Sequence, residues 1–469
     1  MSEAPLLAGI DIGSTNCKVG IYTVDGSPVA ELSRPTVADC DKIARGVLAD
    51  LAACLSRAGR APVAVGVTSM AESGVALDAD LRPLHPLFRW DDPRAAAEAE
   101  AIDSRVGRAA LFATTGVSLG SKTPLARWLW LRHHCPRVLR DMRVWVSAAD
   151  LIATVLIGRP VTDPTLAGRT GALDQRVGRY DKDILGVVGV TAAQLPEIFV
   201  GQAGRARGGL GGLVPGTPVV VAGHDHLVAA FAAGARGPGD TADSMGTAEA
   251  LITVTEHPPS PTAAVAGLSW NRHVDGSHWA LVSGFPGSGR VVNWAAASLL
   301  GAVGDDAFQA FDELAATVAR PTGIVVQPYL AGRAAPAPDP ARTMSMRGVL
   351  ATHRAPDIAM AVLEGACFHL RWMAEEQARH AGHPFGSCRV LGGPSRNRAW
   401  TAVKAEVMPW PVELCRMAEA ACAGAALLAG QAVGIDPAVL PTEPLPRDAE
   451  RAARYETVYT TEFLPEATR

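Results

Sequence analysis

The sequence lacks the features that would place this protein in a membrane, outside the cell or on nucleic acid. No basic segment followed by an apolar stretch opens the chain, so we do not expect secretion. The longest uncharged, helix-like run, Ala420–Ile435, is interrupted by Gln431 and falls short of the ~20 apolar residues that a membrane span needs. A formal net charge of −4 indicates neither nucleic acid nor an anionic membrane as a partner.

Cysteine and lysine are arranged in ways that exclude several common sites. The eight cysteines are scattered without a Cys-x-x-Cys pair, which favours reduced thiols in a cytoplasmic protein over a disulfide framework or a zinc site. None of the five lysines follows a glycine, which excludes a Walker A loop, and a protein-kinase glycine loop is also absent. If the protein binds ATP, it therefore does so through hairpin turns of small residues.

The length of 469 residues predicts two or three domains in an α/β protein. Strand-like and helix-like segments alternate, and the Gly/Pro-rich stretch Gly234–Gly239 is the clearest boundary. Each half begins with an apolar strand, a turn of small residues and a returning strand, which suggests a duplication with a ligand-binding cleft between the halves. We therefore predict one domain over residues 1–238 and a second over 239–469.

Periodicity predicts the main elements of both halves. Helical spacing of apolar residues is expected over Cys40–Ala58, Lys122–Arg132, Leu227–Ala235, Ala355–His380 and Ala418–Ala429. Short apolar runs predict strands over Val63–Val67, Val219–Val221, Gly323–Gln327 and Arg389–Leu391.

The first hairpin, Leu6–Gly26, is suited to phosphate. An apolar strand leads to Asp11 and then to the turn Gly13-Ser14-Thr15, whose N–H groups and hydroxyls can donate to phosphate oxygens. A carboxylate at the end of a buried strand needs a cation, and Mg²⁺ is the one that suits it. The alternative is an ordinary β-hairpin with an aspartate at its bend.

Two further turns of this kind follow later in the chain. The first is Ser244–Thr247, and the second is the glycine-rich segment Leu391–Asn397, which ends a strand and enters a helix. Glycines let a nucleotide lie against the backbone, with the helix N-terminus facing its phosphates. The order and spacing of all three turns indicate a nucleotide site more strongly than any one of them.

Asp225 stands where a β-strand ends and a helix begins, with a histidine on each side. A carboxylate in this position can accept a proton from a substrate hydroxyl. The alternative is an aspartate that caps the helix Leu227–Ala235. His224 and His226 are also spaced as metal ligands, but the sequence offers no obvious third ligand.

In this order, the motifs closely resemble those of the FGGY family of carbohydrate kinases, within the superfamily of sugar kinases, heat-shock chaperones and actin. The matching segments are IDIGSTNCK, AGHDHLVAAFAAGA, DSMGTAEAL, VVQPYLAGRAAPAPDPARTMSMRGV, AVLEGACFHLR, LGGPSRNRAW and EAACAGAALLAG. They cover essentially the whole chain. The resemblance implies an α/β protein of two ribonuclease-H-like (actin-like ATPase) domains with a central interdomain cleft.

The resemblance also implies roles for individual residues. Asp225 would be the general base on the sugar hydroxyl, and Asp11 would organise Mg²⁺ through water. Thr15 and Thr247 would flank the transferred phosphate. The residues expected to bind ATP are Gly13, Ser14, Thr15, Lys18, Gly246, Thr247, Gly392, Gly393 and Asn397.

Sugar recognition is expected from the first half of the chain. Trp90 offers an aromatic face to the carbon skeleton, while Glu72 and Asp92 offer acceptors for hydroxyls. Core packing is the alternative for Trp90. The expected substrate-binding residues are Met70, Glu72, Trp90, Asp92, Asp225 and His226.

The substrate stays open. Met70-Ala71-Glu72 stands where xylulose kinases have Gln-Met-His, and Ala71 replaces the arginine of the Arg-Glu pair in glycerol kinases. We therefore expect an ATP- and Mg²⁺-dependent kinase acting on a hydroxyl of a ketose, polyol or sugar acid. The alternatives are a catalytically weak sugar- or nucleotide-sensing relative and, less well supported, an actin-like filament protein. A small-molecule carbohydrate is the expected partner, and a homodimer is left open.

Overall fold

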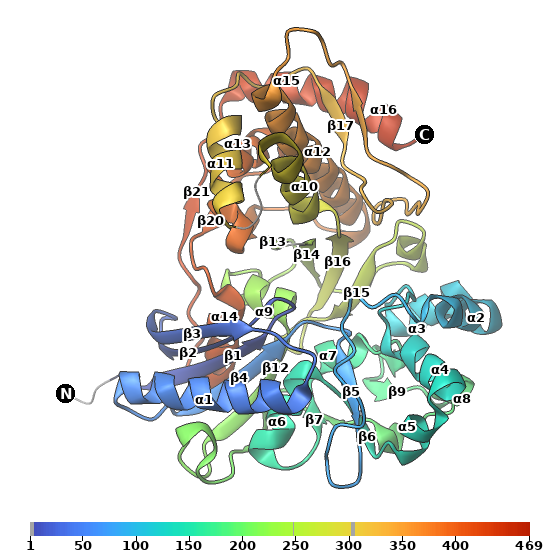
Figure 1. Cartoon of the computed structure of the whole chain (residues 1–469), viewed down its shortest axis with the longest axis vertical. Helices are drawn as coiled ribbons and strands as arrows, with labels where there is room; N and C mark the ends of the chain where they lie inside the picture. Colours follow the sequence, from blue (N-terminus) through green and yellow to red (C-terminus); the bar gives the residue numbers. More distant parts are fainter. Residues whose placement is uncertain (1–3, 247, 302–304) are drawn as a thin grey trace. The chain divides into compact units, whose positions relative to one another are not determined.

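The computed structural model describes residues 4–246, 248–301 and 305–469, and they form two compact units (Figure 1). Unit 1 combines Met1–Ala232 with Trp270–Trp279 and Glu419–Leu440, and unit 2 combines Ala233–Ser269, Ala280–Ala418 and Pro441–Arg469. The division into domains 1–238 and 239–469 stays a prediction. The segment Glu419–Leu440 is thus grouped with the beginning of the chain.

Unit 1 is built on a six-stranded mixed sheet in the order β11-β12-β4-β1-β2-β3. β1 (Leu6–Ile12) pairs antiparallel with β2 (Asn16–Thr23) and parallel with β4 (Ala64–Ser69), and β4 pairs parallel with β12 (Pro218–His224). β3 (Pro28–Pro35) and β11 (Gln202–Arg205) are the edge strands. The carboxyl ends of β1, β4 and β12 therefore meet at one edge of the sheet, which is where open α/β sheets bind ligands.

Helices cover both faces of this sheet (Figure 1). The apolar residues of α1 (Cys40–Ala58) pack into a core cluster with β1 and β2 on one face. On the other face, α14 (Ala420–Gln431) comes so close that a Cβ at Gly9 would lie 2.0 Å from the main-chain oxygen of Cys422. Because side chains alternate along a strand, Asp11 shares the face of Gly9 and lies on the side covered by α14.

The rest of unit 1 surrounds this sheet and includes a mostly helical region packed around the buried Trp128 and Trp145. Its elements are β5 (Gly74–Leu77), α2 (Ala96–Val106), α3 (Arg108–Thr115), α4 (Pro124–His134), α5 (Pro136–Asp141), β6 (Val144–Ser147), α6 (Ala148–Ile157), β7 (Val161–Thr162), α7 (Pro164–Gly168), β8 (Leu173–Asp174), β9 (Arg179–Tyr180), α8 (Lys182–Val188), η1 (Ala192–Gln194), β10 (Glu197–Ile198), η2 (Leu210–Gly212) and α9 (Asp225–Ala232).

Unit 2 contains a mixed sheet in which β16, β14, β13, β19, β20 and β21 follow one another. Its elements are β13 (Thr241–Met245), β14 (Glu249–Thr255), η3 (Pro261–Ala264), β16 (Trp279–Phe285), α10 (Ser288–Leu300), α11 (Asp305–Ala315), β17 (Val325–Gln327), β18 (Ser345–Arg347), α12 (Ala355–Ala381), β19 (Cys388–Leu391), η4 (Gly393–Arg396), α13 (Arg398–Val407), β20 (Val412–Cys415), β21 (Thr442–Pro444), α15 (Ala449–Val458), η5 (Tyr459–Phe463) and α16 (Leu464–Ala467). The chain passes between the units at β15 (Ser269–Arg272). The long helix α12 packs against α10, α11 and α13, so it is the centre of the helical layer.

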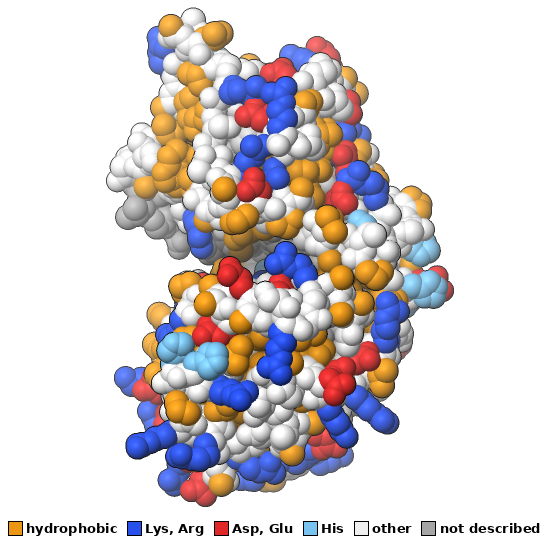
Figure 2. All heavy atoms as spheres, turned by 90° about the vertical axis from the view of Figure 1, so that its right-hand side faces the viewer, with side chains coloured by type: hydrophobic (Ala, Val, Ile, Leu, Met, Phe, Trp, Pro, Cys, Tyr) orange, Lys and Arg blue, Asp and Glu red, His pale blue; other side chains and the backbone are white. Residues whose placement is uncertain are grey.

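The elements expected from periodicity are confirmed. α1 spans the predicted Cys40–Ala58, and α12 extends the predicted helix by one residue to Ala381. The helix predicted from Leu227 begins earlier, at Asp225, directly after β12. Across the described ranges, no helix combines the length and apolar character needed to cross a bilayer. Figure 2 shows basic and acidic side chains interspersed over one face of the molecule.

Candidate functional site

The register of the unit 1 sheet brings Asp11 and Asp225 to the same edge. Asp11 of β1 is paired with Thr68 of β4, and Thr68 is paired with Gly223 of β12. The Thr68 hydroxyl also donates a hydrogen bond of 2.6 Å to the Gly223 carbonyl oxygen. Asp225 follows two residues later as the first residue of α9. Two carboxylates far apart in the chain thus reach one end of three neighbouring strands.

Asp11 is a buried carboxylate that lacks a full set of partners. Its side chain is nearly inaccessible, and among the described residues its Oδ1 atom has no hydrogen-bond partner. Burial and, to a smaller extent, the charge of Asp225 raise its pKa to about 8, while the charge of Lys18 opposes them. An unpaired carboxylate oxygen beside a second carboxylate suits a hard divalent cation such as Mg²⁺.

The turn after β1 is held by the backbone and by an arginine. The Gly13 N–H donates to the Asn16 carbonyl over 3.1 Å, and the Ser14 carbonyl accepts from Nη1 of Arg89 over 2.9 Å. Thr15 is exposed at the tip of the turn. The link to Arg89 joins this turn to the segment that carries Trp90, a connection that sequence reasoning missed.

Lys18 is paired with a residue that sequence reasoning also missed. Its ammonium group forms an ion pair with Glu419, which directly precedes α14. Burial lowers the pKa of Lys18, but the charges of Asp11 and Glu419 outweigh it and raise the pKa above its ordinary value. Lys18 is therefore a charged neighbour of Asp11, and its predicted contact with ATP stays a prediction.

Asp225 lies between two histidines whose rings are in edge contact, 5.4 Å apart. Oδ1 of Asp225 accepts from the His226 backbone N–H over 2.8 Å and lies 3.4 Å from Nε2 of His224. Ligand atoms of the three residues lie within 4.8 Å of one another, so they form a group of three side chains whose spacing could hold a metal ion. Its side chain is 19% exposed and can be reached by a substrate.

Glu72 is engaged by cations. Its Oε1 atom accepts from Nε of Arg169 over 2.9 Å and lies 3.5 Å from Nζ of Lys122. Burial raises the pKa of Glu72, but the positive charges of Arg169 and Lys122 outweigh it and hold the pKa well below its ordinary range. Its backbone has a positive φ of 60°, a conformation uncommon for a residue other than glycine. Neither cation was identified from the sequence.

The other predicted sugar-binding residues differ in how far their side chains are exposed to solvent. Met70 is buried in the core cluster, and Trp90 packs partly against that cluster. The Trp90 backbone N–H donates to the Ser73 hydroxyl over 2.9 Å. Asp92 forms an ion pair of 2.8 Å with Arg94. Core packing therefore accounts for Met70 and for part of Trp90.

In unit 2, the second and third turns lie against each other. β13 and β19 are parallel neighbours in which Ser244 is paired with Leu391, so the turns that follow both strands lie at one edge. A Cβ at Gly392 would be 2.1 Å from the main-chain oxygen of Met245, and Gly392 has a φ of 100°. Only glycine fits this contact. Gly246 belongs to this edge, whereas Thr247 lies outside the described residues.

Gly393 and Asn397 have different surroundings. The ideal Cβ position of Gly393 has nothing within 4 Å, which leaves open space beside the turn. Asn397 is the N-cap of α13, where its Oδ1 accepts from the Trp400 N–H over 2.7 Å. Within the part of the chain that the structure describes, its buried Nδ2 has no partner. The predicted contact of Asn397 with the adenine end stays a prediction.

A buried ionic cluster joins α13 to β13 and β14, the two strands that flank the second turn. Nζ of Lys404, on α13, lies 2.5 Å from Oδ2 of Asp243 and also contacts Oε1 of Glu249. Asp243 and Glu249 stand on the two strands of the hairpin that carries the turn. Sequence reasoning missed this cluster, which joins the helix after the glycine-rich turn to the β13–β14 hairpin that carries the second turn.

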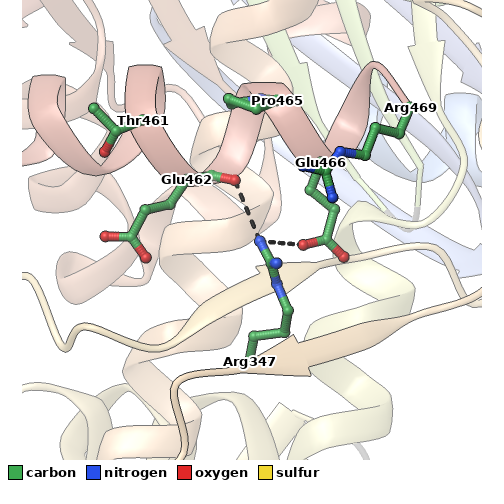
Figure 3. Close-up of a pocket in the computed structure, with 6 residues that line it drawn as sticks. All are labelled: Arg347, Thr461, Glu462, Pro465, Glu466 and Arg469. Carbon is green, nitrogen blue, oxygen red and sulfur yellow. Dashed lines mark hydrogen bonds and ion pairs between the residues drawn. The ribbon is translucent and has the colours of Figure 1, made fainter.

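A separate pocket of about 330 Å³ lies near the end of the chain (Figure 3). It is lined by Arg347, Thr461, Glu462, Pro465, Glu466 and Arg469. Arg347 forms an ion pair with Glu466 across it. None of these six residues belongs to the segments predicted to bind ATP, metal or sugar.

The chain matches two family models over most of its length. The FGGY family of carbohydrate kinases, N-terminal domain, matches residues 6–232, and its C-terminal domain matches residues 242–433. A gluconokinase from Bacillus licheniformis is 23% identical over 91% of this chain and 88% of its own length. A glycerol kinase from Thermus brockianus is 28% identical over 91% and 90%. The crystal structure of xylulose kinase from Rhodospirillum rubrum has a TM-score of 0.88 at 24% identity, covering 99% of this chain and 98% of its own.

Proposed function

Because the chain belongs to the FGGY family of carbohydrate kinases and is thus an ATP-dependent sugar kinase, we propose that it phosphorylates a hydroxyl of a ketose, polyol or sugar acid. The α/β fold of the family, that of the actin-like ATPases, agrees with this. A gluconokinase and a glycerol kinase among the relatives act, by name, on a sugar acid and a polyol. They support the range of substrates proposed and do not select one.

The observation that carries the proposal is the meeting of Asp11 and Asp225 at one edge of the unit 1 sheet. Phosphoryl transfer requires in-line positioning, neutralisation of the phosphate charge and a group that orients the attacking hydroxyl. Asp225, whose carboxylate is partly exposed, meets the need for a group that orients the hydroxyl. Asp11, which is buried and incompletely paired among the described residues, meets the need for charge neutralisation by holding a metal. The exposed fraction of Asp225 suits the base, and Oδ1 of Asp11, which has no partner in the part of the chain that the structure describes, suits a metal.

Asp225 is the proposed general base. The substrate hydroxyl oxygen forms a bond to the γ-phosphorus as the bond from that phosphorus to the bridging oxygen of ADP breaks. The hydroxyl proton passes to the Asp225 carboxylate, and ADP leaves with the bridging oxygen. His224 is neutral beside it, because burial lowers its pKa to about 4 even though the charge of Asp225 raises it. His224 therefore places no positive charge beside the carboxylate.

Asp11 is the proposed residue for Mg²⁺, through water. When bound, Mg²⁺ would offset negative charge on the transferred phosphate. Ser14 and Thr15 of the turn after β1 would donate their N–H groups and hydroxyls to phosphate oxygens, since the Gly13 N–H already donates to Asn16. In unit 2, Gly246, Gly392 and Gly393 would let the nucleotide approach the backbone, with open space beside Gly393.

The proposal is tested by measuring ADP formation with a panel of ketoses, polyols and sugar acids. We expect ADP to form only when ATP, Mg²⁺ and one class of substrate are all present. The product should be a phosphate monoester, which phosphorus NMR identifies. A control variant, Asp41→Asn, changes an exposed aspartate of α1 and should keep full activity. ADP formation that does not depend on any carbohydrate would contradict the proposal.

A further inference from the structure

Three cationic side chains gather around a single carboxylate in unit 1. Arg169 and Lys122 both approach Oε1 of Glu72. The third is Arg127, which is fully buried and whose Nη1 donates to the Glu72 main-chain carbonyl over 2.5 Å. The immediate surroundings of Glu72 thus hold three positive charges and one negative charge.

The charge of Arg127 is not cancelled by its hydrogen-bond partners. Besides the Glu72 carbonyl, its guanidinium donates to the main-chain carbonyls of Arg89 and Ser121. The neighbouring carboxylates form ion pairs of their own, Asp92 with Arg94 and Asp91 with Arg89. Burial lowers the pKa of Arg127 to about 10, which still leaves it charged at neutral pH. A full positive charge in a buried position attracts an anion more strongly than one in water.

Arg169 donates to Glu72 through Nε and Nη2, which leaves its Nη1 atom outside this ion pair. Its side chain is 8% exposed, and Nη1 has no hydrogen-bond partner among the residues that the structure describes. A buried, unsatisfied guanidinium N–H is costly, so such groups usually have a partner. The side chain of Lys122, by contrast, is 43% exposed, which makes it the member of the group that a ligand can reach.

The cationic group adjoins the proposed base. The charges of Asp225, Glu72 and Arg169 all act on the buried ring of His224. His224 is also paired in the sheet with Ser69, three residues before Glu72, so it lies near both the reacting carboxylate and the Glu72 pair. A substrate that presents its hydroxyl to Asp225 would extend the rest of its carbon skeleton toward this group.

We infer that the substrate is a sugar acid whose carboxylate is bound by Lys122, with Arg169 and Arg127 supplying the positive field. This inference rests on the proposed function and narrows its substrate to one class. A neutral hydroxyl would satisfy a donor but would leave the excess positive charge uncompensated. A carboxylate supplies both the acceptor and the charge, and charge-assisted hydrogen bonds are about twice as strong as neutral ones. Glu72 is already ion-paired, so it serves to orient the cations.

The test compares each sugar acid with the neutral alcohol of the same carbon skeleton. Suitable pairs are D-gluconate with D-glucitol, D-galactonate with galactitol, and D-xylonate with xylitol, together with D-xylulose and glycerol. We expect the best substrate by kcat/KM to be an acid, with its alcohol partner poorer by about 10- to 100-fold. A neutral compound as the best substrate would overturn the inference.

Variants of Lys122 identify the residue responsible. Lys122→Met should lower kcat/KM for the acid by about 10- to 100-fold, and Lys122→Glu should lower it further. Activity on neutral alcohols and KM for ATP should change by less than about threefold. Lys182→Met, at an exposed lysine on α8, is the matched control and should behave as the unmodified protein. An equal loss on acids and alcohols would show that Lys122 does not recognise the carboxylate.

The two proposals fail in different ways. If no carbohydrate supports ADP formation, the proposed function itself fails. If neutral compounds are phosphorylated and acids are not, the kinase activity stands and the inference about the substrate falls.

Discussion

Nε2 of His224 lies 3.4 Å from Oδ1 of Asp225, where β12 ends and α9 begins. The imidazole is buried and neutral at physiological pH, because burial lowers its pKa to about 4. The neutral imidazole places no positive charge next to the Asp225 carboxylate. A base placed in this way can accept a proton from a hydroxyl.

Asp225→Asn should remove the base while keeping the shape of the side chain. We expect kcat to fall by about 10²- to 10⁴-fold, because the carboxamide cannot accept the hydroxyl proton. Binding of ATP, measured by calorimetry, should be unchanged. A variant that retained nearly full kcat on the best substrate would show that Asp225 only caps α9.

Asp11→Ala should impair the use of Mg²⁺ without removing carbohydrate binding. The buried Oδ1 atom that would face the metal is lost, so the Mg²⁺ concentration for half-maximal activity should rise and kcat should fall on the order of 10²-fold. The measurement is a Mg²⁺ titration of ADP formation, with carbohydrate affinity measured separately. An unchanged Mg²⁺ dependence would remove Asp11 from the metal site.

Lys404→Met should destabilise unit 2. Burial lowers the pKa of Lys404, but the two fully buried acidic groups beside it, Asp243 and Glu249, outweigh burial and keep the lysine charged. Burial and the charge of Glu249 raise the pKa of Asp243 well above its ordinary value, so Glu249 is the charged partner. Removing one partner of a buried ionic group costs about 3–5 kcal/mol, because the remaining charge is uncompensated. The melting temperature should fall, and KM for ATP should rise more than KM for the carbohydrate, since the cluster holds the β13–β14 hairpin, which we propose to bind the nucleotide.

The double variant Lys404→Met/Glu249→Gln is the control for this interpretation. It removes Lys404 together with the carboxylate of Glu249, whose pKa is lowered. Little net charge is therefore left in the buried cluster. Its melting temperature should lie above that of Lys404→Met. Lys42→Met, at an exposed lysine of α1, should melt as the unmodified protein does. A double variant less stable than the single one would argue against an ionic role for Lys404.

Asp150 predicts a dependence of stability on pH. It closes the capping box of α6, where Oδ2 accepts from the Ser147 N–H over 2.9 Å, and burial raises its pKa to about 7 from an ordinary value of 3.8. The unfolded chain loses this proton first as pH rises, so the contribution to stability is present below pH 4 and is lost by pH 7. The loss is on the order of 4 kcal/mol, since one pKa unit corresponds to about 1.4 kcal/mol.

Asp150→Asn should therefore make the fall of the melting temperature between pH 4 and pH 7 less steep, because the carboxamide keeps the acceptor and does not titrate; burial also raises the pKa of Asp163 and Glu364, so part of the fall remains. Asp181→Asn is the matched control, since Asp181 caps α8 at a less buried position. Its pH profile should follow that of the unmodified protein. Identical slopes for Asp150→Asn and the unmodified protein would show that another group causes the dependence.

Sequence patterns could predict the parts of the fold that depend on local chemistry. The helix Cys40–Ala58 is marked by its apolar spacing and ends at Gly59 in a left-handed conformation, so both follow from adjacent residues. The position of Asp225 at a strand–helix junction is also local. The glycine turns could be recognised because only glycine accepts a close approach such as that of Gly392 to Met245.

The partners of the charged residues depended on the tertiary structure. Glu72 was expected to accept hydroxyls, but the fold places Arg169, 97 residues away, against its carboxylate. Lys404 meets Asp243 and Glu249 from 161 and 155 residues away. No local pattern marks such pairs, because chain folding alone decides which side chains come within hydrogen-bond distance.

The sequence by itself determined the family, the α/β class, the strand–turn–strand hairpins and the carboxylates at strand ends. The tertiary structure decided which of those carboxylates are free to act. Among the described residues, Asp11 keeps an oxygen without a partner and Asp225 is partly exposed, whereas Glu72 is ion-paired. The physical reason is that the energy of a charge depends on its burial and on the charges within a few ångströms, and both quantities are set by packing.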